Sequence, residues 1–109
     1  MFGQCDYFET ARANEAVFRN ILRNLAKGNR AYVPRNLETE LPLEELFDKY
    51  SRGNRYGIFT ITDFRISSTG VAVISYEDIA TLSGGGATLS YKISGEQVTY
   101  AGVECVVMS

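Results

Sequence analysis

The chain has 109 residues, enough for one domain with one hydrophobic core. Apolar residues make up 45% of it and charged residues 22%, which excludes an intrinsically disordered chain. A formal net charge of −2 argues against binding to nucleic acid or anionic lipid through the overall electrostatic field. No apolar run approaches the roughly 18 residues of a membrane helix, and the first residues lack the basic and then apolar pattern of a secretory signal. We therefore expect a single cytoplasmic domain without membrane contact.

The chain has two cysteines, Cys5 and Cys105, and no histidine. The cysteines form no CxxC pair, so no Cys/His metal site is predicted. Two free thiols are expected in the reducing cytoplasm, and a disulfide between them is the alternative. Because serine and cysteine nucleophiles lack a histidine base, no catalytic residue and no cofactor is predicted.

Residues 7–27 are predicted to form one amphipathic helix. Its apolar residues recur with the period of one helix face: Phe18, Ile21, Leu22 and Leu25. Asp6 and Glu9 have the spacing of a capping box, and Gly28 is a typical residue to follow the last turn. These signals for the start and the end of a helix agree with the predicted bounds, residues 7–27.

A second, shorter helix is predicted over residues 42–51, with Pro42 at its first position. Gly53 is expected to end it. Before it, residues 31–33 are predicted to form a short extended piece, because the residue preceding Pro34 is pushed away from helical conformation.

From residue 56 onward the apolar period changes to 2, and Val, Ile, Thr and Tyr dominate, as is typical of strands. Four strands are predicted: residues 57–66, 71–78, 87–93 and 98–108. The short turn-forming segments between them force antiparallel neighbours. The fold class is therefore α+β, with two helices packed on a four-stranded antiparallel meander.

Both faces of the predicted sheet carry apolar side chains. Strict alternation in the first strand puts Phe59, Ile61, Asp63 and Arg65 on one face. Val and Tyr positions in residues 71–76 face away from the long helix, so this outer face is more apolar than a solvent-exposed face. We predict that a second copy of the protein covers part of the sheet, which gives a homodimer.

The last predicted hairpin, residues 87–100, closes with the turn Ser94-Gly95-Glu96. A capped helix, a short helix and a curved meander ending in this hairpin resemble the NTF2-like and cystatin-like cone domains across residues 7–108. Such folds include isomerases, dehydratases, ligand carriers and dimerisation modules, so the resemblance does not select a function. The chain lacks the histidine and the set of acids that enzymatic members place in the cone, which argues against an enzyme.

The predicted long helix has a basic stripe. Spacing by four places Glu15, Arg19, Arg23 and Lys27 along one line of its surface. Such a stripe suits an acidic protein partner or a phosphate backbone. The alternative is a solvated helix face on which Glu15 and Arg19 form a surface ion pair. The stripe has no aromatic residues between its cations, which argues against nucleic acid.

The segment from Tyr50 to Tyr56 is a second candidate for partner binding, through Arg52, Arg55 and Tyr56. Arginine and tyrosine are enriched at interface hot spots, and loops often carry binding. Solvated arginines and inward-facing tyrosines are the alternative. The glycine-rich residues 83–86 lack the lysine and the helix of a phosphate-binding loop and are predicted to be a hairpin loop.

Three functional hypotheses remain. The first is a non-enzymatic, homodimeric interaction module that contacts an acidic protein partner. The second is an NTF2-like small-ligand-binding or isomerase-like domain with an apolar pocket between the long helix and the sheet. Its pocket would be lined by Phe18, Leu22, Phe59, Ile61 and Tyr100, with Asp63 as the polar group or, alternatively, paired with Arg65. The third is a small inhibitor or immunity-type protein.

Overall fold

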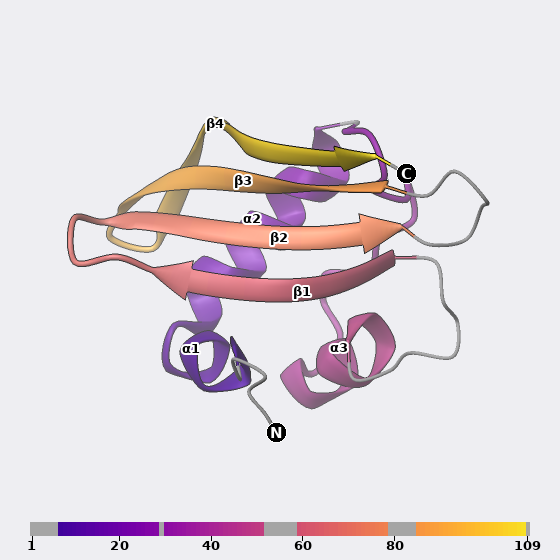
Figure 1. Cartoon of the computed structure of the whole chain (residues 1–109). Coiled ribbons are helices and arrows are strands. Elements are labelled where there is room, and N and C mark those ends of the chain that lie inside the picture. The colour runs from indigo at the N-terminus through magenta and orange to yellow at the C-terminus, as the bar shows by residue number, and fades with distance from the viewer. Residues whose placement is uncertain (1–6, 29, 52–58, 79–84, 109) are drawn as a thin grey trace, which may run out of the picture.

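The structure, a computed structural model, describes residues 7–28, 30–51, 59–78 and 85–108, and of residues 105–108 it describes the backbone. In this part of the chain three helices precede four strands (Figure 1). The elements are α1 (Tyr7–Ala13), α2 (Glu15–Lys27), α3 (Leu43–Tyr50), β1 (Phe59–Ile66), β2 (Val71–Asp78), β3 (Gly85–Ser94) and β4 (Gln97–Met108). The predicted α+β class, with helices first and strands last, is confirmed.

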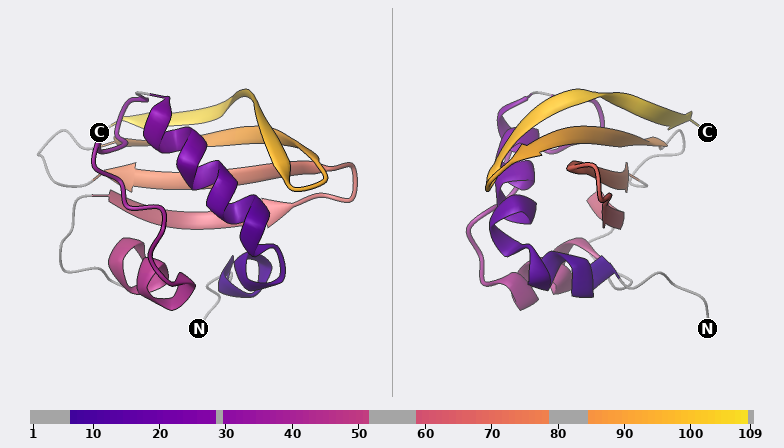
Figure 2. Two further views of the ribbon diagram at one scale, coloured as in Figure 1. Left: turned by 180° about the vertical axis from the view of Figure 1, so that it is seen from behind. Right: turned by 90° about the vertical axis from the view of Figure 1, so that its left-hand side faces the viewer.

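The four strands form one antiparallel sheet in the order β1-β2-β3-β4, which confirms the predicted meander. The helices lie on one side of this sheet, and α2 crosses it obliquely from the β1 side to the β4 side (Figures 1 and 2). No described helix covers the opposite face, which we call the outer face. The helices that the structure describes include none that is long and apolar enough to span a membrane.

The predicted helix over residues 7–27 is in fact two helices, because Asn14 interrupts it. Asn14 has φ −134° and ψ 47°, outside the helical region. Its backbone N–H and its side-chain Nδ2 both donate to Thr10 O, at 3.1 and 2.9 Å, so the asparagine closes α1 and precedes α2. Gly28 ends α2 as predicted, and its N–H donates to Asn24 O at 2.9 Å. Asp6 of the predicted capping box lies outside the described residues.

The second helix is shorter than predicted at both ends. Pro42 precedes its first helical residue, and the Pro42 carbonyl accepts the N–H of Leu46 at 3.0 Å. Ser51 ends the helix, since its N–H and its Oγ both donate to Phe47 O, at 3.0 and 2.6 Å. Gly53 lies outside the described residues. The predicted extended piece over residues 31–33 is a turn instead, with Tyr32 in the left-handed region at φ 68°.

The hydrophobic core lies between α2 and the sheet. All four apolar residues of the predicted helix face are fully buried: Phe18, Ile21, Leu22 and Leu25. The sheet contributes to the same core with Phe59, Ile61, Phe64, Ala72, Ile74, Tyr76, Leu89 and Tyr91. Each large apolar side chain buried in this way stabilises the fold by about 1.5–3 kcal/mol.

A β-bulge in β1 changes which side chains share a face. The pairing of β1 with β2 shifts between Ile61 and Asp63, so Thr62 is the extra residue. Ile61 and Phe64 both face the core, at 2% and 0% exposure, whereas Asp63 and Arg65 face outward. The prediction that Phe59, Ile61, Asp63 and Arg65 share a face is therefore wrong, because one extra residue reverses the alternation. Tyr76 also faces the core, so the predicted outward tyrosine is wrong as well.

We predict a loss of stability at alkaline pH from the buried Tyr91. Burial raises the pKa of Tyr91 to about 12, although the positive charge of Arg30 opposes this, and the usual tyrosine value is about 10. The neutral phenol therefore stabilises the fold below pH 10, and this stabilisation is lost as the pH rises from about 10 to about 12. Denaturant unfolding of the wild type and of Tyr91→Phe should show a shallower decline for the variant across this range. Equal slopes for both proteins would contradict the prediction.

Candidate functional site

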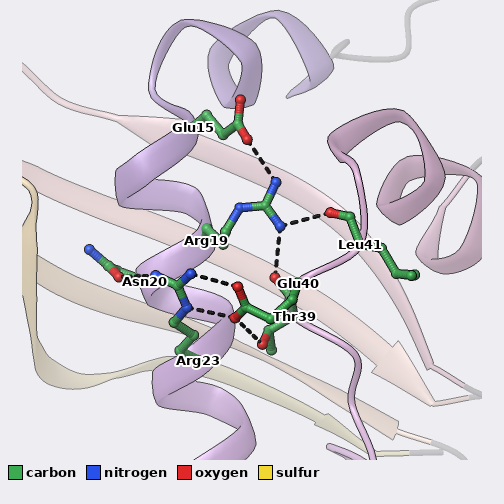
Figure 3. Close-up of polar contacts among 7 residues, drawn as sticks. All are labelled: Glu15, Arg19, Asn20, Arg23, Thr39, Glu40 and Leu41. Carbon is green, nitrogen blue, oxygen red and sulfur yellow. Dashed lines mark hydrogen bonds and ion pairs between the residues drawn. The ribbon is translucent and has the colours of Figure 1, made fainter.

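Arg19, a member of the predicted basic stripe, binds the connector between α2 and α3. Its Nη1 donates to Thr39 O and Leu41 O, both at 2.8 Å, and its Nη2 forms a 2.7 Å ion pair with Glu15 (Figure 3). The side chain is 14% exposed. Arg19 thus holds the connector on α2 by hydrogen bonds to two backbone carbonyls, which a lysine does not match in geometry.

Arg23 makes a second link to the same connector. Its Nε and Nη2 contact the two carboxylate oxygens of Glu40, each at 2.7 Å, and its Nη1 donates to Asn20 Oδ1 at 2.8 Å (Figure 3). The hydrogen bonds from Arg23, with a further one from Thr39, lower the pKa of Glu40 to about 2. Two of the three cations of the predicted basic stripe, Arg19 and Arg23, therefore have internal acid partners.

The positive charge at the end of α2 is not neutralised in this way. Within the part of the chain that the structure describes, Lys27, Arg30 and Arg35 have no carboxylate within ion-pair distance. Lys27 and Arg35 line the same cavity of about 350 Å³, together with Leu25, Ala26, Val33 and Pro34. The structure thus retains Lys27 of the predicted stripe as an accessible cation and adds two cations from the connector.

The centre of the outer sheet face is uncharged. It consists of Val73 and Ser75 on β2 and their β3 neighbours Ser90 and Thr88, which we call the outer strip. Ser75 Oγ and Thr88 Oγ1 lie 2.8 Å apart and share a hydrogen bond, so the two hydroxyl groups satisfy each other. The strip is therefore less apolar than predicted, with small side chains in place of large ones.

Charged residues of both signs border the outer strip: Asp63, Arg65, Glu77 and Lys92. Asp63 Oδ2 and Arg65 Nε form a 2.7 Å ion pair, which confirms the alternative that paired these two residues. The other oxygen of Asp63, Oδ1, is inaccessible to solvent and has no hydrogen-bond partner among the described residues. The border as a whole carries two positive and two negative side chains.

The predicted apolar pocket would bring apolar side chains and the carboxylate of Asp63 together, but the structure separates them. Phe18, Leu22, Phe59 and Ile61 are at most 2% exposed and pack in the core. Asp63 faces away from them because of the bulge at Thr62. Tyr100 packs beside Tyr91, with ring centroids 5.8 Å apart, and the Arg30 guanidinium lies 3.6 Å from its ring centroid. The carboxylate of Asp63 is therefore separated from these apolar side chains by the sheet.

The remaining predicted site residues are those of the segment after α3, and the sequence also singles out the two cysteines. Arg52, Arg55 and Tyr56 lie outside the described residues. So does Cys5, and of Cys105 the backbone alone is described. Among the described residues there is no group of three or more acids or cysteines placed to hold a metal ion.

Sequence reasoning found the Glu15–Arg19 ion pair but missed Glu40 as the partner of Arg23, and it missed the composition of the outer strip. Glu40 lies 17 residues from Arg23 in sequence, and no periodic pattern links the two. The outer strip depends on the bulge and on strand register, which a single sequence indicates weakly. Searches of protein-family models, of curated proteins and of solved structures found no match to this chain.

We predict that the Arg23–Glu40 ion pair makes stability depend on acidic pH. Because the pKa of Glu40 is lowered to about 2, the ion pair stabilises the fold above the usual glutamate value of about 4.3. This contribution is lost as the pH falls from about 4.3 to about 2. In thermal unfolding between pH 2 and pH 6, Glu40→Gln should have a flatter pH dependence than the wild type.

The matched control is Glu45→Gln, which changes an exposed glutamate of α3 that has no ion pair among the described residues. Its pH profile should follow that of the wild type. If the stability of Glu40→Gln depended on pH in the same way as that of the wild type, the Arg23–Glu40 ion pair would not contribute to the acid dependence of stability.

Proposed function

We propose that this chain is a non-enzymatic interaction module that forms a homodimer through the outer face of its sheet and contacts a protein partner. The observation that carries the proposal is the outer strip, an uncharged centre with a border of charges. An NTF2-like or cystatin-like architecture and a cytoplasmic location are parts of the same proposal. The packing of α2 on a four-stranded meander supports the proposed architecture.

The composition of the outer face favours protein contact over solvent. Protein interfaces have a centre depleted in charged residues and a polar rim that stays accessible to water. Val73, Ser75, Thr88 and Ser90 carry no charge, and the Ser90 hydroxyl donates to Gly102 O of β4 at 3.4 Å. Small side chains of this kind allow a second surface to approach closely.

The border charges favour a second copy as the occupant. In a two-fold dimer the same patch meets itself, so the patch must be complementary to itself. Asp63 and Arg65 lie on β1, and Glu77 and Lys92 lie on β2 and β3, so the border has both signs and no net charge. A two-fold arrangement allows each acid to meet a cation of the partner copy, whereas a border of one sign would repel its own copy.

The alternative of a small-ligand-binding domain has less support. Its pocket requires empty volume with a convergent polar group between α2 and the sheet. Phe18 packs against Phe64 there, with ring centroids 5.0 Å apart, and Asp63 lies on the other side of the sheet. The arrangement therefore favours a packed core at that position.

The substitution Val73→Lys tests the dimer. Lysine at the centre of the outer strip would meet the same lysine of the second copy, or be buried there without an acid, so the dimer should dissociate. Size-exclusion chromatography with light scattering across a dilution series should give a dimer for the wild type and a monomer for the variant.

Glu45→Lys is the matched control, because it also adds a lysine but on α3, away from the outer face. This variant should remain dimeric. A monomeric wild type at all concentrations, or a dimeric Val73→Lys that is folded by circular dichroism, would refute the sheet-mediated dimer.

A further inference from the structure

Five of the nine cations of the described chain have an acid partner, and three of the other four lie at one place. Five ion pairs neutralise Arg12, Arg19, Arg23, Lys49 and Arg65. Lys27, Arg30 and Arg35 have no acid partner in the described chain and lie within nine residues of one another in sequence, at the end of α2 and in the turn after it. In a chain with a net charge of −2, this is a local concentration of unneutralised positive charge.

The cavity at this place combines positive charge with an apolar wall. Lys27 enters from the last turn of α2, and Arg35 enters from the connector that follows Pro34. Between them a small apolar wall is formed by Ala26, Val33 and Pro34 above the buried Leu25, and polar atoms make up most of the exposed lining. Its volume of about 350 Å³ reaches the size of ordinary small-molecule sites. A ligand that fits both features has an anionic group next to an apolar one.

Arg30 does not line the cavity but adds a third positive charge near the end of α2. Its guanidinium lies 3.6 Å from the centroid of the Tyr100 ring, and its Nε is inaccessible to solvent without a hydrogen-bond partner in the described chain. The side chain folds back over Gly28, where an added Cβ would lie 3.3 Å from the Arg30 Cγ and Nε. A partly buried cation without a carboxylate raises the affinity of its surroundings for an anion.

We infer that Lys27 and Arg35 bind a carboxylate of an acidic segment in a partner protein, whose neighbouring apolar side chain enters the cavity. The inference rests on the proposed function as an interaction module and names the chemistry of its partner. A peptide is favoured over a nucleic acid because the site supplies few cations for a phosphate backbone and has an apolar wall. It is favoured over a free inorganic anion because such an ion leaves that wall unused.

The probe is a synthetic peptide of alternating glutamate and leucine residues, and its counterpart has glutamine in place of glutamate. Isothermal titration should detect binding of the glutamate peptide to the wild type, weakened by added salt. Lys27→Gln and Arg35→Gln should each weaken binding about tenfold, since each removes one charge-assisted contact worth about 1.4 kcal/mol or more. The glutamine peptide should bind at least tenfold more weakly than the glutamate peptide.

Lys49→Gln is the charge-matched control, because it also removes one positive charge, but on α3, where Lys49 pairs with Glu38 and does not line this cavity. Its affinity for the glutamate peptide should equal that of the wild type. Equal binding of both peptides, equal loss in Lys49→Gln, or no binding to the wild type would overturn the inference. Full competition by inorganic phosphate at millimolar concentration would also overturn it and indicate a site for small anions.

Light scattering on the same Lys27→Gln sample separates this inference from the proposed dimer. Lys27 lies on the helical side of the molecule, so the variant should remain dimeric. A dimer that does not bind the peptide would refute the carboxylate site alone. A monomer that binds the peptide would refute the dimer alone.

Discussion

The burial of one face of α2 against one face of the sheet is the constraint on which the rest of the structure depends. Phe18, Ile21, Leu22 and Leu25 are fully buried, and the removal of their apolar surface from water stabilises the fold. Because this contact uses one face of the sheet, the other face remains as an extended surface. Because it uses one side of α2, the other side is free to hold the connector through Arg19 and Arg23. Both candidate surfaces thus follow from the same packing.

The sequence predicts those parts of the fold that depend on local periodicity. The buried face of α2, its end at Gly28 and the bounds of β2 come from patterns that neighbouring residues share. Two departures arise from single residues. Asn14 interrupts a helical pattern with its own hydrogen bonds to Thr10, and Thr62 inserts one residue into a strand and reverses its alternation. Neither residue type by itself indicates a break or a bulge, since each is also tolerated within regular elements.

The candidate sites depend more strongly on tertiary structure, and less of them follows from the sequence. Spacing by four places Arg19, Arg23 and Lys27 along one line of α2 and pairs Arg19 with Glu15, but it does not reveal that Glu40 pairs with Arg23. Glu40 reaches Arg23 from the connector, and that contact requires the chain to fold back over α2. The result divides a uniform basic stripe into a neutralised part that stabilises the fold and an unneutralised end beside an apolar cavity.

The central claim is that the outer strip is buried between two copies of the chain. It is tested most directly by NMR on protein with labelled valine methyl groups, in the presence of a soluble paramagnetic agent that broadens accessible signals. As the protein concentration rises, the Val73 methyl signals should become protected, whereas those of Val33, on the wall of the cavity beside α2, should stay accessible. Val73 signals that are broadened equally at low and high concentration would contradict the claim.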